Sequence, residues 1–120
     1  MKKNVVSFPS PPTEAPSDSL DARLRFAIAN KRLIEFKYDG AVRVAEPHDY
    51  GLRDGSVKVL VFQRKKSGQQ NDAVRGWRSL EVSKIEECVV LEDTFRGTRE
   101  QTVQQHQEWD VLYARVDHTD

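Results

Sequence analysis

The stretch from Leu33 to Pro47 constrains the fold most, because it predicts a β-hairpin. An apolar-alternating run leads into Asp39-Gly40, a second run follows, and a proline ends it. Two registers compete. A two-residue turn opposes Phe36 to Arg43, whereas a three-residue loop with the glycine in a bulge opposes Phe36 to Val42. Only the second register makes one face wholly apolar, so we expect the bulged hairpin, with pairing that ends at the proline.

The remaining segments predict one helix and several short strands. We expect the helix to begin at a cap on Asp18 or Ser19 and to run to about Arg32. Its buried face is expected to hold Leu20, Leu24, Ala27 and Ile28. Strands are predicted at Val57–Arg64, Val74–Val82 and Cys88–Leu91, with a loop at His48–Gly55, a mobile connection at Lys65–Ala73 and a tight turn at Ser83–Ile85. Five short strands behind one N-terminal helix predict a mainly β fold, a small and strongly bent antiparallel barrel.

The length of 120 residues fits one domain with a modest core. Residues 1–17 contain four prolines among serines and threonine and are expected to be a disordered lead-in. Residues 18–96 hold the helix and the barrel. Residues 97–120 are expected to be an acidic C-terminal extension, in which Val111–Val116 either adds a strand or packs as an arm.

Composition bears on the compartment. No apolar run is long enough to span a bilayer, and no apolar signal core follows the first lysines. The single cysteine excludes an internal disulfide and fits a reducing environment. We therefore expect a cytoplasmic protein that does not contact membranes.

The formal net charge of zero conceals an asymmetry along the chain. Residues 64–84 hold six basic and two acidic side chains, whereas residues 86–120 hold nine acidic and three basic ones. This distribution suggests either an anionic partner or pairing of the two segments within the molecule.

Candidate catalytic groups are few. Cys88 follows two glutamates in an apolar strand, where their charges and burial are both expected to raise the thiol pKa. His48 and Asp49 are adjacent, so they are not expected to face each other, and no nucleophile motif accompanies them. Neither His106 nor His118 has partners at metal-ligand spacing, and no glycine-rich phosphate loop is present. We expect a binding module without a metal or cofactor, not an enzyme.

Basic and aromatic side chains are the remaining candidates for a site. Arginines near an aromatic ring on a small barrel can hold a phosphate and stack a base. The alternative interpretation is a solvated charged face with Trp77 in the core. The predicted ligand-binding or nucleic-acid-binding residues are Tyr38, Arg43, Arg64, Arg75, Trp77, Arg78 and Lys84.

Taken together, these segments resemble the WYL domain family of bacteria. The shared pattern is a helix leading into a hydrophobic strand that ends in Tyr38, an Arg-x-x-Glu-Pro element, and a late element before a strand that reaches a phenylalanine. In this chain the three parts are residues 27–38, Arg43–Pro47 and Arg78–Ile85, and the resemblance covers about residues 20–96. Gly76-Trp77-Arg78 is similar to a step found in short members. The tripeptide that names the family corresponds here to Lys58-Val59-Leu60.

The resemblance implies an Sm-like small barrel with a ligand-sensing role. Members of the family occur in transcription regulators and phage-defence regulators, and several are thought to bind nucleic acid or a nucleotide-like effector. Tyr38, Arg43, Arg78 and Lys84 match family positions, whereas Arg64, Arg75 and Trp77 are added from charge and aromatic placement. We expect no helix-turn-helix before the barrel, because one helix and the lead-in would leave no room for it.

Two function classes stay open, with a hydrolase or nuclease as a third and weaker hypothesis. The first is a sensor of single-stranded nucleic acid or a nucleotide. The second is a protein-interaction or homo-oligomerising accessory subunit of a regulator.

Overall fold

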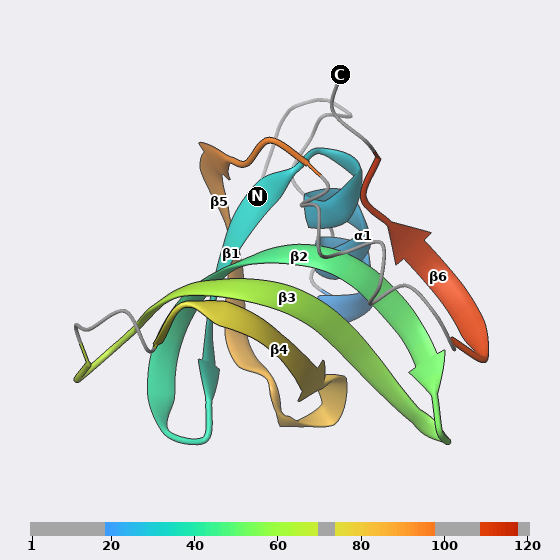
Figure 1. Cartoon of the computed structure of the whole chain (residues 1–120), viewed down its shortest axis with the longest axis horizontal. Helices are drawn as coiled ribbons and strands as arrows, with labels where there is room; N and C mark the ends of the chain where they lie inside the picture. The colour runs from blue at the N-terminus through green and yellow to red at the C-terminus, as the bar shows by residue number, and fades with distance from the viewer. Residues whose placement is uncertain (1–18, 70–73, 98–108, 118–120) are drawn as a thin grey trace, which may run out of the picture.

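The computed structural model describes residues 19–69, 74–97 and 109–117. These residues form one α-helix, one short 3-10 helix and six strands (Figure 1). In chain order the elements are α1 (Leu20–Ala29), β1 (Arg32–Tyr38), β2 (Ala41–Arg53), β3 (Ser56–Lys66), β4 (Gly76–Glu81), η2 (Val82–Lys84), β5 (Glu86–Thr94) and β6 (Val111–Arg115). The predicted mainly β class with one N-terminal helix is confirmed.

The strands form one antiparallel sheet in the order β4-β3-β2-β1-β5, and β6 pairs with β2. Figure 1 shows β2 and β3 as long, curved neighbours. The sheet is open, since β4 and β5 stand at the two ends of this order. The second half of β2 lies between β3 and β6, which is the added strand considered for the C-terminal extension.

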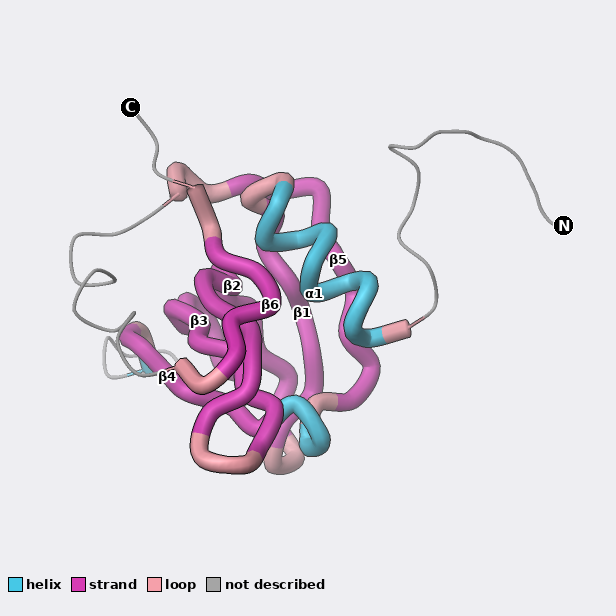
Figure 2. The backbone as a smooth tube through the Cα atoms, turned by 90° about the vertical axis from the view of Figure 1, so that its right-hand side faces the viewer, coloured by secondary structure: helices cyan, strands magenta, loops and turns pink. Residues whose placement is uncertain are grey.

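The helix begins and ends for identifiable reasons. The Ser19 side chain accepts a hydrogen bond from the backbone N–H of Ala22, as an N-cap does. The helix ends at Ala29 and not near Arg32 as predicted, because Lys31 takes a left-handed φ of 54° and turns the chain into β1. Leu24, Ala27 and Ile28 are buried as expected. Figure 2 shows α1 beside β1, β5 and β6 on one side of the sheet.

A short hydrogen bond joins the helix to the sheet. The Tyr50 hydroxyl on β2 donates to Asp21 Oδ1 at 2.6 Å. This bond lowers the pKa of the Asp21 carboxyl, and burial raises the pKa of Tyr50. The contact fixes the first turn of α1 against β2.

The predicted hairpin register is wrong. Phe36 faces Arg43, and Lys37 faces Val42, which is the pairing of the two-residue turn. Asp39 and Gly40 both have positive φ, 50° and 78°, as the turns that match the twist of hairpin strands require. The physical reason is that Arg43 is tolerated inside, where its guanidinium has hydrogen-bond partners, and the small Ala41 and Ala45 complete the buried face.

Pairing does not end at Pro47, and the predicted loop that follows is mostly strand. Pro47 faces Val61 on β3, and a bulge at His48 precedes the next pair. On the opposite edge of β2, the pairing with β1 reaches Ala45, and the pairing with β6 begins at Asp49. Pro47 lies between these two paired segments. Because no strand pairs with it on that edge, its missing backbone N–H costs no hydrogen bond there. Only the Asp54-Gly55 turn remains of the loop.

The other strand predictions hold with shifted ends. β3 and β5 are longer than expected, β4 is shorter, and η2 includes two residues of the tight turn predicted at Ser83–Ile85. The core lies between α1 and the concave sheet. It includes Leu24, Ile28, Ile34, Phe36, Val59, Val61, Leu80 and Phe95. No helix within the described ranges has the length and apolar character needed to cross a bilayer.

The predicted disordered lead-in of residues 1–17 lies outside the described residues, as do His106, His118 and part of the Lys65–Ala73 connection.

Candidate functional site: a basic pocket beside the first hairpin

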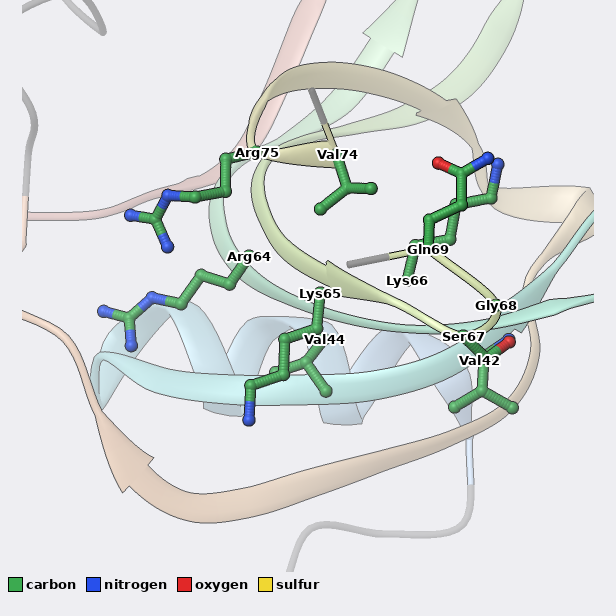
Figure 3. Close-up of a pocket in the computed structure, with 10 residues that line it drawn as sticks. All are labelled: Val42, Val44, Arg64, Lys65, Lys66, Ser67, Gly68, Gln69, Val74 and Arg75. Carbon is green, nitrogen blue, oxygen red and sulfur yellow. The ribbon is translucent and has the colours of Figure 1, made fainter. Parts of the chain in front are cut away.

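A pocket of about 510 Å³ lies where the first part of β2 meets the end of β3 (Figure 3). This volume is within the range of about 300–1,000 Å³ that is usual for small-molecule sites. Four of the lining side chains are cationic, three are valines, and none of the described lining residues is acidic. The pocket is lined by Val42, Val44, Arg64, Lys65, Lys66, Ser67, Gly68, Gln69, Val74 and Arg75.

The hairpin register and a bulge build this pocket. Since Arg43 points into the core, Val42 and Val44 stand on the opposite face, where Val42 is 41% exposed. Lys65 pairs with Val44, and the next pair is Gln63 with Ala45, so Arg64 is the extra residue of a bulge. Bulges of this kind re-aim side chains beside binding sites. Here Arg64 and Lys65 both line the pocket.

Two hydrogen bonds fix the turn that closes one side of the pocket. The backbone N–H of Val42 donates to Ser67 Oγ at 3.0 Å, and the Ser67 N–H donates to the Val42 carbonyl at 2.8 Å. The turn after β3 is thereby bound to the start of β2. The backbone at Val42 and the backbone just after Lys66 therefore have a fixed relative position.

A buried carboxylate holds Arg64. The Arg64 Nε donates a hydrogen bond to Glu46 Oε2 at 2.8 Å, and Glu46 is only 1% exposed. The other oxygen, Oε1, lies 3.1 Å from Nε2 of the buried His48. His48 Nδ1 has no hydrogen-bond partner among the described residues. The carboxylate thus orients the Nε edge of the Arg64 guanidinium, and no other hydrogen bond of this guanidinium is found among the described residues.

An aromatic ring holds Arg75. The guanidinium carbon lies 5.7 Å from the centre of the Phe62 ring, a cation–π distance. Phe62 packs edge-on against Trp77 at 5.4 Å, and Trp77 packs against His48 at 4.8 Å. Arg75 is exposed, and no described carboxylate forms an ion pair with it. Both pocket arginines are therefore connected to His48, one through a carboxylate and one through two rings.

The predicted site residues fall into separate places. Arg64 and Arg75 both line the pocket. Half-buried Trp77 packs against Phe62, the ring that contacts Arg75. The guanidinium of Arg78 donates to the carbonyls of Trp77 and Val74 at 3.0 and 3.4 Å. It therefore supports the start of β4. The basic and aromatic set is thus only partly one surface.

Tyr38, Arg43 and Lys84 do not lie at this pocket. Arg43 is 8% exposed, and it donates to the Tyr38 carbonyl and to Gln63 Oε1. The Tyr38 hydroxyl accepts a hydrogen bond from the backbone N–H of Glu81. Lys84 is exposed on η2, beyond the end of β4 that is opposite Arg75.

The candidate catalytic groups have structural contacts. Asp49 accepts hydrogen bonds from Arg115 and from Trp109 Nε1, and His48 contacts Glu46 instead. Burial raises the pKa of the Cys88 thiol to about 11, while the charge of Arg23 opposes that change. The predicted direction and the predicted effect of burial are confirmed, whereas the neighbouring glutamates are not among the causes of the pKa change. Within the described part of the chain, no three metal-ligating side chains gather.

Sequence reasoning missed the residues that position the arginines. The sequence places Glu46 only in the Arg-x-x-Glu-Pro element and Phe62 only in a predicted strand. A signal was present for Glu46, since Glu46 and His48 are two residues apart and share one face wherever that stretch is a strand. The prediction that pairing ends at Pro47 concealed it.

Comparisons of the chain with protein-family models, curated proteins and solved structures find no match. The contacts and charges of the basic pocket therefore carry the functional argument.

Proposed function

We propose that this protein is a non-enzymatic, WYL-like sensing or regulatory module. It binds single-stranded nucleic acid or a nucleotide-like ligand through the basic pocket. The observation that carries the proposal is the gathering of four cationic side chains around three valines, with Phe62 and Trp77 behind Arg75. We also propose that the strongly curved sheet is related to the Sm-like small barrels.

The chemistry of the lining suits a phosphate. Guanidinium groups bind phosphate oxygens through paired N–H donors, and lysine ammonium groups add charge with less directional demand. The Glu46 contact leaves the outer edge of Arg64 available, and Arg75 rests on a ring face that leaves its N–H donors uncommitted. The valines offer an apolar surface for a base or sugar.

Fluorescence anisotropy at low salt tests the proposal, with labelled single-stranded DNA, single-stranded RNA and cyclic nucleotides as probes. We expect binding by the wild-type chain, and a loss of about tenfold or more for Arg75→Ala, since each charge-assisted contact contributes about 1.5–3 kcal/mol. Lys84→Ala is the matched control, because it removes one positive charge outside the pocket. Absence of binding to every one of these probes, and to nucleoside monophosphates as well, would refute the proposal.

The second candidate is a protein-interaction or self-associating subunit of a transcriptional or phage-defence regulator. Exposed apolar side chains favour it: Val89 on β5 is 53% exposed, and Val111 and Leu112 on β6 are 49% and 39% exposed. Light scattering at high protein concentration tests self-association. An apolar interface would persist at high salt, whereas phosphate binding would weaken.

A further inference from the structure

The two pocket arginines come from adjacent segments, Arg64 from β3 and Arg75 from the residue before β4. Arg64 and Arg75 extend in the same direction in Figure 3, with Val44 and Val74 nearer the backbone. Each guanidinium is held from behind, Arg64 by Glu46 and Arg75 by the Phe62 ring. Side chains held in this way lose little conformational freedom when a ligand binds.

The cations gather around one pocket instead of following a groove. Proteins that bind the middle of a single strand usually present a basic track with stacking rings along it. Here Arg64, Lys65, Lys66 and Arg75 line one cavity, and its described lining contains no aromatic ring. Such a concentration of positive charge favours a single phosphate with two negative charges over a chain of singly charged diesters.

The apolar part of the pocket indicates what the phosphate is attached to. Val42, Val44 and Val74 form the apolar part of the lining, where Val42 is 41% exposed, Val44 is half-buried and Val74 is already buried. A ligand that covered these methyl groups would gain free energy from burial of apolar surface. Inorganic phosphate alone would leave them uncovered.

We infer that the pocket binds a phosphate monoester that carries an apolar or planar group, a class that includes nucleoside monophosphates. The phosphate lies between the guanidinium groups of Arg64 and Arg75, and the attached group covers the valines. Glu46 is a positioning residue that holds Arg64. This inference rests on the proposed function, because it names the ligand class of the same pocket.

Isothermal titration calorimetry with three probes tests the ligand class: phenyl phosphate, methyl phenyl phosphate and inorganic phosphate. Phenyl phosphate has an apolar ring and a second ionisation near pH 6, methyl phenyl phosphate stays singly charged, and inorganic phosphate has no ring. At pH 7.5 we expect phenyl phosphate to bind about tenfold more tightly than either of the others, because only it combines a doubly charged phosphate for the arginines with an apolar ring for the valines.

Variants divide the contributions. Val44→Ser should reduce phenyl phosphate affinity toward that of inorganic phosphate and leave inorganic phosphate binding unchanged. Glu46→Ala should weaken binding of both, whereas Glu46→Gln keeps an acceptor for Arg64 Nε and should restore most of the affinity. If the Ala variant does not fold, Val44→Ser, which leaves Glu46 in place, still tests the ligand class.

The outcomes separate this inference from the proposed function. If an oligonucleotide binds through Arg75 while phenyl phosphate binds no better than the other two probes, the ligand class is wrong and the proposed function stands. If neither the oligonucleotide nor any phosphate probe binds, both are wrong. Preferential binding of phenyl phosphate that depends on Val44 supports the inference.

Discussion

Arg43 is a charged side chain inside the fold, and its contacts make a structural role testable. Its guanidinium donates to the Tyr38 carbonyl at 3.0 and 3.3 Å and to Gln63 Oε1 at 3.2 Å, and it lies 5.3 Å from the Tyr38 ring. Arg43→Ala would remove the side-chain donor from these buried acceptors. We expect the free energy of unfolding to fall by about 1–3 kcal/mol, measured by urea denaturation.

Lys84→Ala serves as the control for this substitution as well. Lys84 is exposed on η2, so its removal should change stability by less than about 0.5 kcal/mol. If Arg43→Ala kept full stability but lost phosphate binding, Arg43 would belong to the binding site and not to the core.

Cys88 links stability to alkaline pH. Burial raises the pKa of its thiol from 9.0 to about 11, so the folded state favours the neutral thiol. The stabilisation from this group is therefore complete below about pH 9 and is lost as the pH rises to 11, by roughly 2–3 kcal/mol at most. We expect wild-type stability to fall more steeply than that of Cys88→Ala between pH 8.5 and 11, measured by urea denaturation. Parallel curves would contradict this prediction.

At the scale of elements, Gly51 permits β6 to pair with β2. A Cβ atom at this position would lie 2.2 Å from the Val111 carbonyl oxygen and 3.1 Å from Leu112 Cα. Gly51→Ala should therefore displace β6 while the pairing of β1 with β5 persists. Hydrogen exchange is the measurement, and we expect amides of Val111–Arg115 to exchange on the order of tenfold faster or more.

Gly40→Ala is the matched control for a glycine substitution. The space around Gly40 is open, but its φ of 78° disfavours a side chain. This variant should lose about 1 kcal/mol of overall stability without selective exchange in β6. Equal protection of β6 in both variants would show that the close contact at Gly51 is relieved by other movements.

The elements also show how far sequence reasoning reaches. Apolar spacing identified α1, β3 and β5, because their buried side chains are mostly apolar. The prediction of the hairpin register was wrong because it placed the valines on the buried face. Val42 and Val44 instead line a pocket, and a hydrogen-bonded arginine occupies the interior. Which buried polar group will find partners depends on contacts distant in sequence.

The same limit applies to the site. Local charge identified Arg64 and Arg75, which both line the pocket. Local charge also grouped them with Lys84. Proximity in sequence does not reveal that Arg75 and Lys84 lie beyond opposite ends of β4. Glu46 lies 18 positions before Arg64, and only the pairing of β2 with β3 brings them together. The strands determine which charges meet, and the pairing could not be deduced from charge.

For the whole molecule, the arrangement of charge predicts the salt dependence of binding. Each phosphate neutralised on a single strand contributes a slope of about −0.7 to the plot of log affinity against log salt concentration. Four cations line the pocket, so the slope for a short 5′-phosphorylated oligonucleotide should not exceed about −3 in magnitude.

Single substitutions then locate the charges that matter. Lys65→Ala should reduce the slope by about 0.7, because Lys65 borders the pocket. Lys84→Ala should leave the slope unchanged, since Lys84 lies beyond the far end of β4. Anisotropy titrations at five salt concentrations measure both. A slope that both substitutions reduce equally would mean that the oligonucleotide contacts the whole surface, and the basic pocket would then not be the site of recognition.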